Sequence, residues 1–198
     1  MPTVLTLASK QRRMMDFYNK ENLNDDNNQF KIYLAVGFSD EWPLNKPRVP
    51  LETDDLTTYN TLIYGYQAYK EVLFARVIQN PTEEQKETCI YYQDCYYETI
   101  SNHQQALEEG YTRIMLRWTL DKDEYFPVDD GQGGSTMYNV LGMYIDVNTG
   151  DIDSAYFIST EDWNNRVEDQ GTLELISTRS VISRSADQSE DITILLEF

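Results

Sequence analysis

The sequence predicts a mainly β fold: an antiparallel β-sandwich of about eight or nine strands with a few short helices, for which α+β is the alternative label. Apolar and polar residues alternate over several runs of strand length, and no regular succession of strand and helix indicates a parallel sheet. Hydrophobic residues make up 40% of the 198 residues, enough for a core. We expect one sandwich domain, residues 1–198, formed by both chain ends, with the middle (about 56–175) supplying strands, short helices and loops.

Strands are predicted where apolar residues alternate between turn signals. The expected strands cover residues 30–38, 69–81, 88–100 with a kink at Gln93–Asp94, 111–126, 171–185 and 191–198. Residues 137–158 predict a β-hairpin, because Asn148 and Gly150 suit turn positions between two alternating runs. In the last strand Ile192, Ile194, Leu196 and Phe198 share one face, which we expect to point into the core.

Short helices are predicted from caps and spacing. The first covers residues 9–22, with Ser9 as N-cap and with Met14 and Tyr18 on one face. A weak helix is expected to begin near Asp54. Residues 101–109 predict a third helix with a Ser101–Gln104 capping box and Gly110 at its end, and one helical turn is expected after Ser159 or Thr160. Three further segments are expected to lack regular structure: the proline-containing residues 39–55, the solvated loop 81–87 and the acidic glycine loop 127–135.

The charge excludes some classes of partner. Sixteen Lys and Arg stand against 34 Asp and Glu, a net charge of −18. Nucleic acids and anionic membranes require a basic footprint, so neither is expected as a partner. No apolar run approaches the roughly 20 residues of a membrane span, and the N-terminal basic residues follow an apolar stretch, the reverse of a secretory signal. The acidic surface is either simply solvated or faces basic partner proteins.

No catalytic or metal-binding constellation is present. His103 is the only histidine, and its polar neighbours in a predicted helix indicate an exposed residue rather than a general base. Cys89 and Cys95 are expected to be reduced core thiols, since only a tight turn at Gln93–Asp94 could join them. Residues 146–153 lack the Gly and Glu positions of a calcium loop, and the hairpin turn explains them better. No cofactor, no metal and no enzymatic activity are expected.

Both ends of the chain resemble a known family. The sequence "RRMMDFYN" (12–19), followed by "FKIYLAVGFSDEW" (30–42), resembles the N-terminal region of the baseplate wedge protein of T-even-type contractile-tailed bacteriophages, the gene-product-eight family. The terminal "ADQSEDITILLEF" (186–198) resembles the end of the same proteins, where an acidic pair precedes a strand that finishes on Phe. The best-known member is longer and carries an inserted domain, so this chain resembles a compact version.

The resemblance implies a structural virion protein of the tail baseplate, assembled in the host cytoplasm. It implies a homodimer that packs against other wedge proteins of a contractile tail, without a cofactor. It also implies fold markers rather than sites: Phe17 and Tyr18 docking the first helix, Gly37 allowing close backbone approach, Trp42 anchoring the proline-containing segment, and Ile192, Ile194 and Phe198 in the closing strand. The alternative hypothesis is a tail-associated carbohydrate- or receptor-binding β-sandwich module that uses the 15 Tyr and 3 Trp as stacking platforms.

Overall fold

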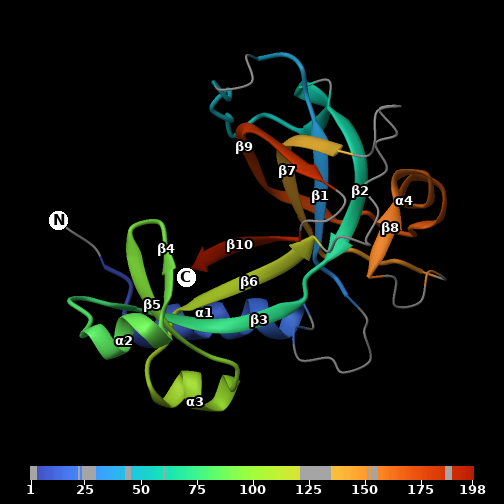
Figure 1. Ribbon diagram of the computed structural model, residues 1–198. Helices are drawn as coiled ribbons and strands as arrows, with labels where there is room; N and C mark the ends of the chain where they lie inside the picture. Colours follow the sequence, from blue (N-terminus) through green and yellow to red (C-terminus); the bar gives the residue numbers. More distant parts are fainter. Residues whose placement is uncertain are drawn as a thin grey trace. The chain divides into compact units, whose positions relative to one another are not determined.

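The computed structural model describes residues 4–21, 23, 30–42, 46–59, 61–120, 135–150, 152, 156–185 and 189–198. In these residues ten strands form two five-stranded sheets, accompanied by four α-helices and one 3₁₀ helix (Figure 1). The predicted class, mainly β with antiparallel pairing and a few short helices, is confirmed. The described chain contains ten strands, where the sequence predicted eight or nine.

The chain divides into two compact units, each assembled from separate stretches of sequence. Unit 1 consists of Met1–Leu23, Lys70–Arg117 and Thr193–Phe198, and unit 2 consists of Asn24–Tyr69 and Trp118–Ile192. Unit 1 therefore takes residues from both ends of the sequence. The strands β6 (Arg113–Leu120) and β10 (Glu190–Glu197) continue along the chain from one unit into the other. The single sandwich domain expected over residues 1–198 stays a prediction.

The sheet of unit 2 has β1 at its centre. Its strand order is β8 (Phe157–Ser159), β2 (Leu62–Ala68), β1 (Tyr33–Phe38), β7 (Ser135–Ile145) and β9 (Thr172–Ser185). β1 pairs antiparallel with β2 on one side and with β7 on the other. Both of its faces are buried, because Tyr33 and Ala35 are as inaccessible as Leu34 and Val36. The alternation in residues 30–38 thus predicted a strand correctly, and its second face is covered as well.

Trp163 fills the core of unit 2. It projects from α4 (Thr160–Arg166), whose N-cap is Ser159 as predicted, and it is 1% exposed. Its ring stacks on Tyr66 at 3.7 Å between centroids and meets Tyr33 and Tyr144 edge-on at 5.7 and 5.3 Å. Aromatic pairs of this kind contribute about 0.5–1.5 kcal/mol beyond the area they bury. Trp163 therefore fixes α4 on the sheet.

The second sheet has the order β10, β6, β3 (Glu71–Ile78), β5 (Cys95–Ile100) and β4 (Ile90–Tyr92). Unit 1 also contains α1 (Leu7–Lys20), α2 (Glu83–Thr88) and α3 (His103–Glu108). α1 buries Met14 and Tyr18 on one face, as predicted, and the Tyr18 ring lies 5.2 Å from that of Phe74 in β3. The helix begins two residues before Ser9, because the Thr6 hydroxyl accepts a hydrogen bond from the Ser9 amide and caps it.

The expected kink at Gln93–Asp94 is a tight turn between β4 and β5. Both residues have positive φ, 46° and 62°, which suits a two-residue hairpin. In this hairpin Cys95 pairs with Tyr92 rather than with a cysteine. Cys89 and Cys95 are free thiols, as predicted, and both are half-buried rather than in the deep core.

The predicted hairpin over residues 137–158 is wrong. β7 pairs with β1 on one edge and with β9 on the other, so no edge of β7 remains for the segment that follows it. β8 instead pairs with β2. The turn signal was real, since Gly150 has φ +59° and Asn148 bridges to Asp169. A local turn signal does not determine which strand becomes the partner.

Three smaller predictions are corrected. Residues 81–87 were expected to be a loop but contain α2, which a Thr82–Gln85 capping box begins and which buries none of its residues. α3 is capped by Asn102 rather than Ser101, although Gly110 follows it with φ +81° as expected. The weak helix near Asp54, expected to extend through residues 53–67, is wrong in its second half: only Leu56–Tyr59 form a 3₁₀ helix, η1, and the strand β2 follows. The glycine loop 127–135 lies, except for Ser135, outside the described residues.

Candidate interaction surfaces

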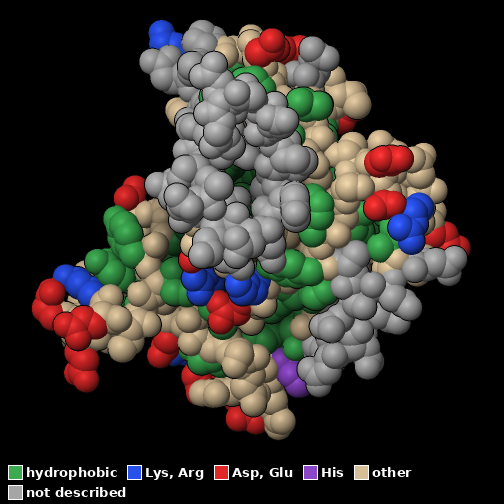
Figure 2. Space-filling model, turned by 45° about the vertical axis from the view of Figure 1, so that its right-hand side comes forward, with side chains coloured by type: hydrophobic (Ala, Val, Ile, Leu, Met, Phe, Trp, Pro, Cys, Tyr) green, Lys and Arg blue, Asp and Glu red, His purple; other side chains and the backbone are tan. Residues whose placement is uncertain are grey.

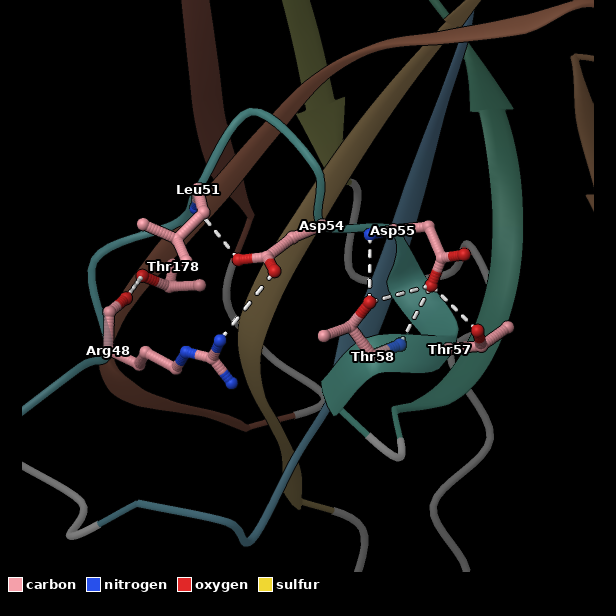
Figure 3. Close-up of polar contacts among 7 residues, drawn as sticks. All are labelled: Arg48, Leu51, Asp54, Asp55, Thr57, Thr58 and Thr178. Carbon is pink, nitrogen blue, oxygen red and sulfur yellow. Dashed lines mark hydrogen bonds and ion pairs between the residues drawn. The ribbon is translucent and has the colours of Figure 1, made fainter.

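A closed turn in unit 2 is held against β9 by polar contacts (Figure 3). The Leu51 amide donates to Oδ2 of Asp54 at 2.7 Å, and the Asp54 amide donates back to the Leu51 carbonyl at 3.0 Å. Nη2 of Arg48 lies 3.6 Å from the same carboxylate, whose side chain is only 5% exposed. The Thr178 hydroxyl in β9 donates to the Arg48 carbonyl. These contacts fix a segment that contains no regular structure, as the prolines of residues 39–55 predicted.

A pocket of about 310 Å³ lies between this turn and the start of β9. The turn residues lining it are Pro50, Leu51, Glu52 and Asp54, and the strand residues are Leu173, Glu174, Leu175 and Ile176. Three carboxylates therefore border a concave, partly apolar surface at the outer strand of the sheet. Val49 and Leu51 are 80% and 59% exposed beside it. We call Val49, Leu51, Glu52, Asp54 and Glu174 the turn surface.

The next carboxylate, Asp55, caps η1. It accepts hydrogen bonds from the Thr57 hydroxyl at 2.6 Å and from the Thr58 amide and hydroxyl at 2.8 and 3.0 Å. The Thr57 bond, followed by those from Thr58, lowers the pKa of Asp55 below its usual value of 3.8. Asp55 therefore remains ionised at the turn, and it serves the local backbone rather than a ligand.

Unit 1 offers a surface of opposite charge on α1. Four basic residues and one acidic residue, Asp16, give this helix a net charge of +3. We call Lys10, Arg12, Arg13 and Lys20 the basic face. The Arg12 and Lys20 side chains are 84% and 57% exposed, and the Arg12–Asp16 ion pair is long at 3.7 Å. Apolar side chains precede the basic face: Val4, Leu5 and Leu7 are 87%, 43% and 55% exposed.

The residues considered as candidates for catalysis or metal binding belong to neither surface. His103 is exposed at the start of α3, as predicted, and its ring packs 5.8 Å from that of Tyr18. The one histidine, purple in Figure 2, lies at the surface, and acidic side chains in red occur over much of the visible face. Among the described residues, no group of three or more His, Cys, Asp or Glu is placed to hold a metal ion.

The predicted fold markers near the chain ends lie in unit 1 or lead into it. Phe17 and Phe198 are in ring contact at 5.4 Å, which joins α1 to the end of β10. Ile192 and Ile194 are 5% and 7% exposed. Phe198 is half-buried, and its amide donates to the Thr112 carbonyl at 3.3 Å.

The remaining two markers lie in unit 2. Trp42 is 7% exposed and belongs to the cluster around Trp163. Gly37 sits where β2 approaches β1: an added Cβ would lie 2.6 Å from Cγ2 of Thr61 and 2.9 Å from the Leu62 carbonyl oxygen. Neither residue lies in the turn surface. Neither the turn surface nor the basic face was predicted from the sequence, although four basic residues within the 14 of α1 are a signal that could have indicated the basic face.

Residues 26–198 match the model of a protein family described as "Baseplate wedge 3 tail fiber network component". The chain belongs to this family. The predicted baseplate wedge class is therefore confirmed, and with it a structural component of the phage tail baseplate that associates with other baseplate proteins. The matched region contains the turn surface, whereas α1 precedes it. No curated protein matches the sequence. Within the described residues no helix is both long and apolar enough to cross a membrane.

Proposed function

We propose that this wedge-family chain is a structural subunit of the baseplate wedge in a contractile phage tail, and a compact counterpart of the T-even gene-product-eight proteins. The observation that carries the proposal is the family match over residues 26–198. In this role the chain forms a homodimer, binds other wedge proteins through its surface and catalyses no reaction. It assembles in the host cytoplasm and binds neither nucleic acid nor membrane. The resemblance of both chain ends to the gene-product-eight family supports the finer assignment.

The composition of the candidate surfaces agrees with a binding role. Protein interfaces combine apolar anchors with a polar rim, and the turn surface places Val49 and Leu51 next to three carboxylates. A turn that is already held by Arg48, Asp54 and Thr178 loses little conformational freedom when a partner binds. Such preorganisation favours tight packing in a multi-subunit assembly.

The test is the composition of the phage particle. Quantitative mass spectrometry of purified tails should detect the chain at a copy number that is a multiple of six, and a nonsense mutation in its gene should yield particles without complete baseplates. An amber-suppressed phage grown in the same host is the control for polar effects on neighbouring genes. Complete, infectious tails without the chain would refute the proposed role.

A further inference from the structure

Charge is divided very unevenly within this chain. α1 carries +3 and the whole chain −18, so the remaining residues carry −21. Unit 2 alone has 7 Lys and Arg against 23 Asp and Glu, a net charge of −16. Two copies of so acidic a protein repel one another unless a basic region of one copy faces an acidic region of the other. The basic face is the concentration of positive charge that α1 supplies.

The two surfaces also match in their apolar parts. Val4, Leu5 and Leu7 lie beside the basic face, and Val49 and Leu51 lie within the turn surface. Exposed apolar side chains rimmed by charge are typical of protein–protein contacts. Both surfaces are held in place by contacts within their own unit. The opposite side of α1 is buried through Met14 and Tyr18, and the Thr178–Arg48 contact fixes the turn. Each is therefore presented to a partner in a defined shape.

We propose that the basic face of one copy binds the turn surface of a second copy. Arg12 and Arg13 meet Glu52 and Glu174 of the other molecule, while the apolar residues of the two surfaces pack together. Two such contacts related by a two-fold axis would use both surfaces of each copy and close a dimer. This inference rests on the homodimer in the proposed function and assigns its interface.

Because the charged side chains are exposed, the association is sensitive to salt. The Debye length falls from about 10 Å at 0.1 M to about 3 Å at 1 M salt, so the dimer should weaken as salt is added. The apolar contacts retain part of the affinity at high salt. A purely apolar interface would show no such dependence.

Charge reversal in the full chain tests the assignment by sedimentation velocity over a concentration series. The variants Arg12→Glu/Arg13→Glu and Glu52→Lys/Glu174→Lys should each weaken self-association at least about tenfold, because like charges then face each other. All four substitutions in one chain should restore association, because the charges are opposite again. The control Lys86→Glu/Arg166→Glu has the same charge change as the first variant at exposed ion pairs outside both surfaces.

The outcomes separate this inference from the wedge role. A wild-type chain that stays monomeric at low salt overturns the proposed interface, as does a control that dissociates as strongly as Arg12→Glu/Arg13→Glu. Failure of the fourfold variant to associate, with circular dichroism showing that it is folded, also overturns it. If tails nevertheless contain the chain in multiples of six, the wedge role is supported and only the proposed dimer interface is refuted.

Discussion

The two units differ in net charge and in their content of tryptophan. Unit 1 is nearly neutral, with 9 Lys and Arg against 11 Asp and Glu, whereas unit 2 carries −16. All three tryptophans, Trp42, Trp118 and Trp163, lie in unit 2 and are at most 7% exposed. Self-repulsion destabilises a compact state, and burial of large aromatic side chains opposes it. The more strongly charged unit is thus the one that contains the buried tryptophans.

The largest expected effects test whether the units unfold together. Trp163→Ala in unit 2 and Phe74→Ala in unit 1 should each lower the free energy of unfolding by about 3–5 kcal/mol, because both side chains are fully buried. Unit 1 contains no tryptophan, so tryptophan fluorescence during urea unfolding reports on unit 2, including the end of β6 that belongs to it.

We expect Phe74→Ala to shift the fluorescence transition although the substitution is in the other unit, since the sequence predicts a single domain. Far-ultraviolet circular dichroism of the same samples reports on both units. A fluorescence midpoint that Phe74→Ala leaves unchanged, with circular dichroism showing an earlier transition, would contradict the single-domain prediction.

The next effect concerns close backbone packing in unit 2. Gly37→Ala should cost about 1–3 kcal/mol, because the new Cβ would press on Thr61 and on the Leu62 carbonyl, which belongs to the backbone of β2. Gly110→Ala is the matched change in unit 1, where the nearest atom is 3.6 Å away and only the positive φ is unfavourable. Thermal unfolding of both variants compares the steric cost at Gly37 with the cost of a positive φ at Gly110. If Gly37→Ala were as stable as the wild type, close packing of β2 against Gly37 would be contradicted.

A smaller effect is expected where α1 meets the end of β10 in unit 1. The Phe17 and Phe198 rings should couple by about 0.5–1.5 kcal/mol in a double-mutant cycle with alanine, as aromatic pairs at this separation do. Chemical unfolding of the two single variants and the double variant gives this coupling. If the decreases in the free energy of unfolding of the two single variants add up to that of the double variant, the contact between the two rings does not stabilise the fold.

The smallest effect is the pH dependence contributed by Asp55. Its pKa is lower in the folded chain than the usual 3.8, so its contribution to stability is present above pH 3.8 and is lost as the pH falls through the folded value. In Asp55→Asn that part of the acid sensitivity should disappear, whereas Thr57→Ala should raise the pKa of Asp55 toward 3.8, because the Thr57 hydroxyl is the largest cause of the shift. Carboxyl titration by nuclear magnetic resonance measures this directly, and an unchanged pKa in Thr57→Ala would contradict the hydrogen bond assigned to the Thr57 hydroxyl.

The sequence predicted elements whose signal is local and missed pairings that depend on distant residues. The strand over residues 30–38 and the cap at Ser159 follow from alternation and side-chain chemistry. The hairpin after β7 failed because β1 and β9 compete for the same edges, and neither competitor is visible in the turn itself. α2 was missed for a different reason: it is polar all round, so only its Thr82–Gln85 capping box could have revealed it.

The same distinction applies to the candidate surfaces. The basic face lies within one helix, so its charge could be read from consecutive residues. The turn surface depends on the Thr178–Arg48 contact, which joins residues 130 positions apart, and no periodic pattern connects them. The exposure of Val49 and Leu51 agrees with the surface segment that the prolines of residues 39–55 predict.

The pairing of β10 with β6 has a consequence for synthesis of the protein. β6 ends at Leu120 and its outer neighbour begins at Glu190, so a nascent chain that has left the ribosome as far as β9 presents an open strand edge at β6. Open edges are templates for pairing with other chains. During translation, this edge of β6 therefore stays open to misassembly until β10 has been synthesised and pairs with it.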